Sequence, residues 1–189
     1  MSLNIFKEKI LFSRVKNKDR KAFIEAYDLY ADEIFRFVFF KVGSKEEAED
    51  VTSSVFLKTW NHIQNNTVTD SKTLRALIYK IARNAVIDYY RENSKKNILT
   101  EDEFVENDIE DEKQDILKNT EVLSDISIVE QGLSELKDEY REVIILRFVE
   151  ELSISEIADV LKKTKGNVRI LTFRALKALK DLISSKYKK

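Results

Sequence analysis

The chain has 189 residues, of which 35% are charged, and its formal net charge is −1. It contains no cysteine and a single histidine, His62, which excludes disulfides and thiolate metal sites and argues against a histidine-based metal centre. Proline is absent and only three glycines occur, so the residues that tight turns between strands require are scarce, and we expect an all-α protein.

The first half of the chain predicts amphipathic helices. Apolar residues recur at three- and four-residue steps from 23 to 42, and Gly43 then suits a helix C-cap. Ser44 and Glu47 have the spacing of a capping box, which predicts a second helix that continues to Ile63.

A polar loop at 64–70 precedes a third helix, which apolar periodicity places at about 71–93. We expect the three helices to form one domain over residues 20–95, with residues 1–19 as an N-terminal extension. No apolar run reaches the roughly 18 residues of a membrane span, so we expect a soluble, cytoplasmic protein without membrane insertion.

Charge is distributed unevenly along the chain. Between positions 100 and 115 there are nine acidic residues and one basic residue. From position 162 to the end there are ten basic residues and one acidic residue. This asymmetry indicates charged partners, and we interpret residues 96–128, which lack a sustained apolar stripe, as an acidic linker.

Apolar periodicity returns after the linker and predicts a second helical domain over residues 129–189. Ser153 and Glu156 form another capping-box pattern, which begins a short helix ending near Leu161. A polar turn and a long basic helix follow, an order typical of a helix-turn-helix. The stripe expected to face the core of this domain before the helix-turn-helix is Leu133, Leu136, Tyr140, Val143, Ile144 and Phe148.

The last helix has two distinct faces at about 100° per residue. A phenylalanine among lysines is unusual for a solvated face but could meet a thymine methyl, so we interpret the outer face as DNA-binding. We expect Gly166, in the first turn, to let the backbone approach DNA. The alternative is a solvated lysine-rich helix in which Gly166 has no role. The core face comprises Val168, Leu171, Ala175, Leu179 and Leu182, and the outer face Lys162, Lys165, Arg169, Phe173, Lys177 and Lys180.

At this point the sequence resembles the extracytoplasmic-function (ECF) sigma factors of the bacterial sigma-70 superfamily. The segment "AEDVTSSVFLKTWNHI" (48–63) resembles region 2.2, and "LIYKIARNAVIDYYR" (77–91) resembles regions 2.3 and 2.4. The segment "LSELKDEYREVIILRFVEELSISEIADVLKKTKGNVRILTFRALKAL" (133–179) resembles region 4. The resemblance implies a region 2 helical bundle and a region 4 helix-turn-helix, joined by the acidic linker.

The resemblance also implies a function. Sigma factors bind core RNA polymerase, through its beta-prime coiled coil and beta flap, and direct promoter-specific transcription initiation. Promoter DNA, double-stranded and melted, would be the second partner, and an anti-sigma factor is a candidate third. No cofactor or metal is expected. The residues implied for polymerase binding are Asp50, Phe56, Leu57, Lys58 and Trp60.

Two sets of residues are implied for DNA. The third helix and the loop before it would engage the minus-10 element and capture melted bases, and the last helix would read the minus-35 element. Core packing is the simpler interpretation of the tyrosines in this region, most of all for Tyr89. The minus-10 set is Asn65, Asn66, Arg75, Tyr79, Lys80, Arg83, Asn84 and Arg91. The minus-35 set is Lys165, Asn167, Arg169, Ile170, Phe173, Arg174 and Lys177.

The sequence departs from the family pattern at several positions. Ser53 and Ser54 stand where a glutamine and an acidic residue are frequent, and Leu77 replaces a frequent tryptophan. Ile170 and Leu171 stand where a small polar and a basic residue are frequent. Leu171 falls on the predicted core face, whereas Ile170 falls outside it and would alter the promoter contact.

Two other functions remain to be weighed. A helix-turn-helix regulator that does not act through polymerase explains the second domain but not the match in the first. An enzyme is disfavoured, because the sequence has no Glu-x-x-His pair, no glycine-rich phosphate loop and no nucleophile motif. The carboxylates at 46–50 suit the positive end of a helix dipole better than a metal site.

Overall fold

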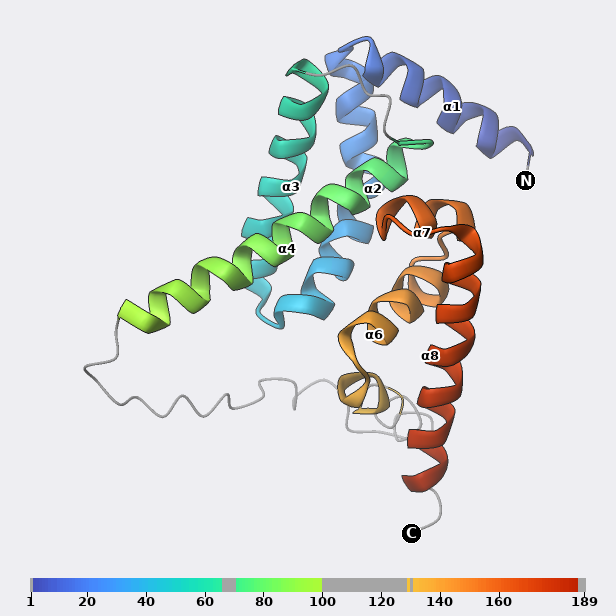
Figure 1. Ribbon diagram of the computed structural model, residues 1–189. Helices are drawn as coiled ribbons and strands as arrows, with labels where there is room; N and C mark the ends of the chain where they lie inside the picture. The colour runs from blue at the N-terminus through green and yellow to red at the C-terminus, as the bar shows by residue number, and fades with distance from the viewer. Residues whose placement is uncertain (1, 66–70, 100–128, 130, 187–189) are drawn as a thin grey trace, which may run out of the picture.

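The computed structural model describes residues 2–65, 71–99, 129 and 131–186, and every regular element within these residues is a helix. The all-α prediction is therefore confirmed. The helices form two groups that lie side by side, an N-terminal bundle of α1 to α4 and a C-terminal bundle of α6 to α8 (Figure 1). The C-terminal residues of α4 project away from both groups (Figure 1).

The N-terminal bundle is built around α2, which contacts the three other helices of the group. Its members are α1 (Ser2–Lys16), α2 (Arg20–Val42), α3 (Lys45–Asn65) and α4 (Leu74–Leu99). Aromatic rings reinforce the packing, since the Phe37 and Tyr79 ring centroids lie 5.4 Å apart, edge to face. The interior also includes Ala26, Ile34, Val55, Ile63, Leu77 and Ile78, all buried.

The helix caps predicted from the sequence in this bundle are largely present in the structure. Gly43 ends α2 in a left-handed conformation with φ of 81°, and its N–H donates to the Phe39 carbonyl. Before α3, the Glu47 N–H donates to Ser44 Oγ at 3.5 Å, the serine half of the predicted capping box. At the start of α2, Asp19 accepts hydrogen bonds from the Lys21 and Ala22 N–H groups.

Helix α1 occupies the segment that the sequence indicates only as an extension. Phe12 and Val15 are buried against the bundle, whereas Phe6 and Ile10 are exposed. Its apolar residues therefore do not share one face, which explains why periodicity does not reveal it.

The C-terminal bundle contains the predicted helix-turn-helix. Residues 131–135 are helical and precede α6 (Asp138–Ile144), and α7 (Ile154–Val160) and α8 (Lys165–Lys186) follow. The capping box of Ser153 and Glu156 is complete, with both reciprocal contacts present. Helices α6 and α7 both pack on α8, and the core residues predicted on it, Val168, Leu171 and Ala175, are buried.

The expectation that Phe148 faces the core is wrong. Ile145–Val149 form a π-helical turn, η2, in which the Glu150 N–H donates to the Ile145 carbonyl at 2.9 Å. A π turn inserts one residue into the helical register, so side chains after it rotate away from their α-helical positions. Phe148 consequently lies on the surface, 52% exposed, while Glu150 is turned inward.

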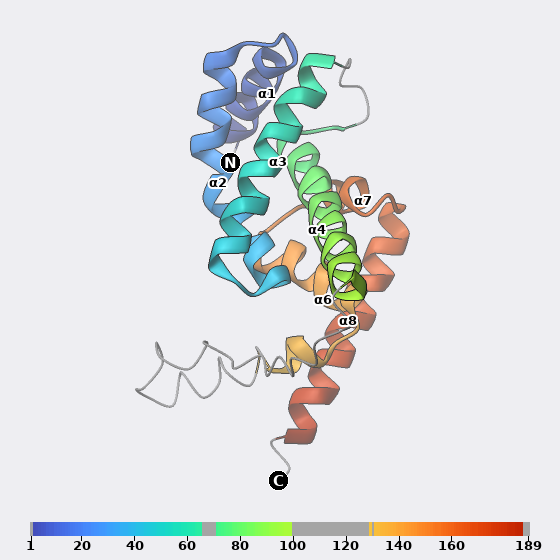
Figure 2. The same ribbon diagram turned by 90° about the vertical axis from the view of Figure 1, so that its left-hand side faces the viewer.

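The two bundles meet along α4. This helix contacts α7, and the buried apolar residues of both bundles belong to one continuous cluster. In the rotated view α4 lies between α3 on one side and the C-terminal bundle on the other (Figure 2). Helix α4 thus contributes to the core of the first bundle and to the seam with the second.

The described residues contain neither a candidate membrane span nor a candidate metal-binding cluster. None of their helices combines the length and apolarity needed to cross a bilayer. They also hold no cluster of three or more acidic, histidine or cysteine side chains that could bind a metal ion.

We predict opposite effects on stability from alanine at two glycines. Gly43→Ala places a side chain in the left-handed region and should lower the free energy of unfolding by about 1 kcal/mol. Gly166→Ala should raise it, by up to about 1 kcal/mol, because alanine favours helix and its Cβ would lie 3.8 Å from the nearest atom, Thr164 Oγ1. Urea denaturation measures both, and an unchanged Gly43→Ala midpoint would contradict the proposed cap.

Candidate nucleic-acid and polymerase interfaces

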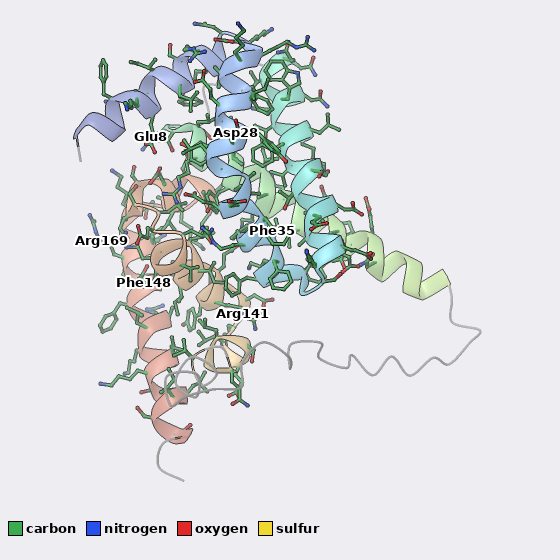
Figure 3. The ribbon with its side chains drawn as sticks, turned by 180° about the vertical axis from the view of Figure 1, so that it is seen from behind. Glu8, Asp28, Phe35, Arg141, Phe148 and Arg169 are labelled. Carbon is green, nitrogen blue, oxygen red and sulfur yellow. The ribbon has the colours of Figure 1, made fainter. Side chains whose placement is uncertain are left out.

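Helix α8 presents the minus-35 set on its outer side. The Asn167 N–H donates to Thr164 Oγ1 at 3.1 Å, which begins the helix and fixes the direction of its first turn. All seven side chains of the set are exposed, as the opposite face is taken up by the core. Arg169 projects away from the N-terminal bundle (Figure 3).

The outer face of α8 combines cations with apolar groups. Lys165, Arg169, Arg174 and Lys177 form no ion pair with any described residue, so their charges remain available to an external anion. Phe173 is 70% exposed and Ile170 is exposed beside it in the helix. Such a surface can bind phosphates through its cations and thymine methyl groups through its apolar side chains.

Gly166 is not required by the internal packing of α8. Its φ is not positive, and a Cβ there would meet only Thr164 Oγ1, at 3.8 Å. The close approach of its backbone to DNA stays a prediction.

The six members of the minus-10 set that lie on α4 divide into two groups on different sides of the helix. Arg75, Tyr79 and Arg83 are spaced by four residues and face the C-terminal bundle, where all three have hydrogen-bond partners. Asn84 and Arg91 lie on another side of the helix and are exposed, and Lys80 is half-buried. One side of α4 is thus open to solvent, and the other is engaged with the second bundle.

Arg75 and Tyr79 converge on Glu150. Arg75 Nε donates to Glu33 at 2.9 Å, and its Nη2 donates to the main-chain carbonyl of Glu150 at 2.6 Å. The Tyr79 hydroxyl donates to Glu150 Oε2 at 2.7 Å, and Arg36 lies 3.4 Å from the same oxygen. Tyr79 is fully buried in this arrangement, so its ring packs against Phe37 and does not face solvent.

Glu150 is an incompletely satisfied buried acid. It is 1% exposed, and its Oε1 has no hydrogen-bond partner among the described residues. Burial raises the pKa of this carboxyl, and the Glu33 carboxylate adds to the effect, whereas the Tyr79 hydroxyl and Arg36 oppose it. The net direction shows that loss of water outweighs the gain from its partners.

Further along α4, Arg83 meets a second carboxylate of the C-terminal bundle. Its Nε donates to Glu142 at 3.1 and 3.2 Å, and Lys41 Nζ lies 3.7 Å from Glu142 Oε1. Burial lowers the pKa of Lys41, while Glu142 acts to raise it. Glu142 is buried between the two cations.

At its N-terminal end, α4 is joined to α7. The Lys72 N–H donates to Asp159 Oδ2 at 3.1 Å, and the Thr73 hydroxyl donates to Glu156 Oε1 at 3.1 Å. These contacts place the helix-turn-helix directly beside the start of α4. The nearby Asn65 is exposed at the end of α3, and Asn66 lies outside the described residues.

The polymerase-binding set on α3 also divides by face. Asp50, Leu57 and Lys58 lie on the surface, with Leu57 63% exposed and Lys58 3.3 Å from Asp88 of α4. Phe56 is buried, and Trp60 is half-buried against Phe23 with ring centroids 4.8 Å apart. The outward residues can contact a partner directly, and the two aromatic residues hold α3 on α2.

Sequence reasoning missed the acidic side of the seam. Glu142, Glu150, Glu156 and Asp159 approach the N-terminal bundle from α6, α7 and the turn between them. One signal was available, because Glu142 and Glu150 flank the segment VIILRFV, which is apolar apart from Arg147, and a charged side chain beside buried apolar residues normally has a partner. The identity of that partner was not available from the local sequence.

The sequence matches two known protein families. Residues 26–96 match sigma-70 region 2, and residues 126–179 match sigma-70 region 4. The fold resembles that of the sigma factor RpoE in complex with the anti-sigma factor NepR from Bartonella quintana, with a TM-score of 0.64, 21% identity and coverage of 87% and 98% of the two chains. It also resembles CnrH in complex with the cytosolic domain of CnrY, with a TM-score of 0.66, 20% identity and coverage of 94% and 97%.

Several curated proteins are similar along most of the chain. The ECF RNA polymerase sigma factor SigM of Bacillus subtilis is 28% identical, and the match covers 84% of this chain and 93% of SigM. BldN of Streptomyces coelicolor, also an ECF RNA polymerase sigma factor, is 30% identical, and the match covers 92% of this chain but 64% of BldN. With both sigma regions present in order, the chain belongs to the sigma-70 family as a sigma factor of the ECF type.

Proposed function

We propose that this sigma factor joins core RNA polymerase to promoter DNA through three separate helices. The outer face of α3 binds polymerase, α4 engages the minus-10 element, and α8 reads the minus-35 element. The observation that carries the proposal is the outer face of α8, where exposed cations that form no ion pair within the described part of the chain surround Phe173. A face of this kind, held opposite a packed core, suits the major groove.

Polymerase binding is assigned to the exposed part of the α3 set. Leu57 offers an apolar group at a surface position, and Asp50 and Lys58 offer charges around it. By resemblance, this surface meets the beta-prime coiled coil, and the C-terminal bundle meets the beta flap. Residues 20–95 and 129–189 then act as two units, with residues 96–128 as the connector.

Minus-10 recognition is assigned to α4 and the loop before it. Lys80, Asn84 and Arg91 lie outside the stripe that faces the C-terminal bundle, and Asn84 and Arg91 are exposed to solvent. Arg75, Tyr79 and Arg83 lie against the C-terminal bundle, so their use on DNA requires that this bundle be elsewhere. Asn65, at the end of α3, and Asn66, outside the described residues, complete the set.

The mode of action is binding and not catalysis. Sigma factors are non-catalytic initiation factors, and we propose the same for this chain, acting in the cytoplasm without a cofactor. One of the fold relatives described above, RpoE, is in complex with an anti-sigma factor, which supports an anti-sigma factor as a candidate partner. A helix-turn-helix regulator independent of polymerase is disfavoured, because it leaves the region 2 match without a role.

Run-off transcription tests the function directly. Purified core RNA polymerase is mixed with fragmented DNA from the source organism, with and without this protein. We expect discrete new transcripts only when the protein is present, and alignment of their start sites supplies the promoter sequence. No new transcripts together with no association with core polymerase would overturn the proposal.

We predict that two alanine variants separate the two binding activities. Arg169→Ala should weaken promoter binding by roughly 1–3 kcal/mol, the usual contribution of one good DNA contact, and leave polymerase binding intact. Leu57→Ala should weaken polymerase binding by about 1–2 kcal/mol, through lost apolar burial, and leave DNA binding by the free protein intact. Fluorescence anisotropy with labelled DNA or labelled protein measures each.

Two control variants change an exposed cation and an exposed leucine outside the proposed interfaces. Lys45→Ala removes an exposed cation far along the chain from α8, and Leu29→Ala truncates an exposed leucine of α2. Neither should change either affinity by more than about 0.5 kcal/mol. Equal losses of both activities in Arg169→Ala would show that α8 is a folding scaffold.

A further inference from the structure

The polar contacts across the seam between the two bundles all run in the same direction. In every side-chain hydrogen bond or ion pair described across it, the donor belongs to the N-terminal bundle and the acceptor oxygen to the C-terminal bundle. Four acceptors are carboxylates and one is a main-chain carbonyl. The donors are Arg36, Lys41, Lys72, Thr73, Arg75, Tyr79 and Arg83, and the carboxylates belong to Glu142, Glu150, Glu156 and Asp159.

A row of anionic oxygens is also what a DNA backbone presents. One N–H of Arg83, on Nε, is shared between both oxygens of Glu142, at 3.1 and 3.2 Å, and a charged guanidinium donates equally well to the oxygens of a phosphate. Arg75 is neutralised by Glu33 and held by the Glu150 carbonyl, and its guanidinium is mostly buried. While these bonds exist the Arg75 guanidinium is largely closed off from DNA, and the Nε of Arg83, whose side chain is 36% exposed, is occupied by Glu142.

We propose that the C-terminal bundle is an intramolecular competitor of DNA for α4. In the closed arrangement Glu142 and Glu150 occupy the stripe of Arg75, Tyr79 and Arg83, so closing and DNA binding by this stripe exclude one another. The part concerning DNA rests on the function proposed for α4, whereas the closed arrangement itself rests only on the contacts above. Helix α8 differs, because its outer face is exposed in the closed arrangement.

Competition of this kind has a defined effect on affinity. If only a small fraction of the molecules is open, the apparent dissociation constant of DNA for α4 is the intrinsic value divided by that fraction. Removing a seam carboxylate therefore tightens DNA binding without adding any contact to DNA. Conversely, DNA that binds the open form should pull the two bundles apart.

The distance between the bundles can be measured by fluorescence energy transfer. The chain contains no cysteine, so the variants Lys21→Cys in α2 and Asp181→Cys in α8, both at exposed positions, can be labelled without any native cysteine reacting. Glu142→Lys replaces the partner of Arg83 and Lys41 with a like charge and should open the seam. Glu139→Lys makes the same charge change on the same helix, but Glu139 pairs with Lys163 within the C-terminal bundle.

We expect Glu142→Lys to lower the transfer efficiency. We also expect it to bind a fork-junction DNA about tenfold more tightly than Glu139→Lys does. A tenfold change corresponds to an open fraction that rises from about 5% to about half. Excess fork DNA should lower the efficiency of the wild-type protein as well. Glu142→Gln, which keeps the side-chain shape, provides a milder opening variant, with Glu139→Gln as its control. Circular dichroism verifies that each variant is folded.

Two results would overturn the inference. One is an unchanged transfer efficiency in both folded Glu142 variants, because the seam would then not depend on this carboxylate. The other is opening without tighter DNA binding than in the Glu139 controls, which would remove the competition. Failure of run-off transcription with opening and DNA competition intact would instead overturn only the proposed function.

The buried Glu150 adds a pH dependence to the same measurement. Arg36 and Glu33 of α2 and Tyr79 and Arg75 of α4 surround it, and burial raises its pKa in the closed form. Opening returns this carboxyl towards its ordinary pKa of 4.5, so closing takes up a proton. The closed form therefore gains stability as pH falls from above the raised pKa towards 4.5, and loses it as pH rises.

We expect the transfer efficiency of the wild-type protein to rise between pH 8 and pH 5, and Glu150→Gln, which cannot titrate at this position, to show a clearly smaller rise. The comparison isolates Glu150, because the other acidic groups are present in both proteins. Identical pH profiles would show that Glu150 does not respond to closing and would contradict its place in the seam.

Discussion

The position of the two bundles depends on one constraint, the meeting of donors on α2 and α4 with carboxylates on the C-terminal bundle. Exposed ion pairs contribute between zero and about 1 kcal/mol each, and a buried acid with one unsatisfied oxygen is costly. Glu150 belongs to the second kind, because its Oε1 has no hydrogen-bond partner within the described ranges and its pKa is raised. The polar contacts therefore set the register of the seam, and the continuous apolar cluster around them supplies most of its stability.

A seam of this composition is suited to opening. When the C-terminal bundle leaves, the cations and hydroxyls on α4 would bind water or another anion in its place. The free-energy cost of breaking their hydrogen bonds to the carboxylates is therefore small. Arg83, already one-third exposed, illustrates the point. The apolar part of the seam would remain to be covered, which makes the balance between closed and open forms sensitive to a partner that binds either bundle.

Helix α4 is the element through which structure and function are connected. One side packs against α2 and α3, a second holds the carboxylates of the other bundle, and a third faces solvent. Helix α8 has no such conflict, because its inner side is occupied by α6 and α7 and its outer side is exposed. Of the two helices assigned to DNA, α8 is therefore accessible in this structure, whereas part of α4 is covered by the C-terminal bundle.

The π turn η2 has a particular role in this arrangement. Its extra residue turns Phe148 to the surface and Glu150 towards α4, while an unbroken α-helix would place them differently. Arg147 secures the following chain by donating to the Leu152 carbonyl at 2.8 Å. The acidic contact to Tyr79 thus depends on a local irregularity of the backbone.

The sequence by itself determined the features that arise between neighbouring residues. The helical class, the Gly43 cap, the Ser153 capping box and the two faces of α8 follow from spacing and backbone preference, which act over a few positions. It also carried enough motif to indicate the family.

Tertiary structure decided the rest. Tyr79 and Glu150 are 71 positions apart and Arg83 and Glu142 are 59 apart, so no local pattern could pair them. Which side of α4 faces DNA and which faces the second bundle depends on that pairing. Helix α1 and the exposure of Phe148 were likewise undetermined, because burial is set by what packs against a residue and not by its own periodicity.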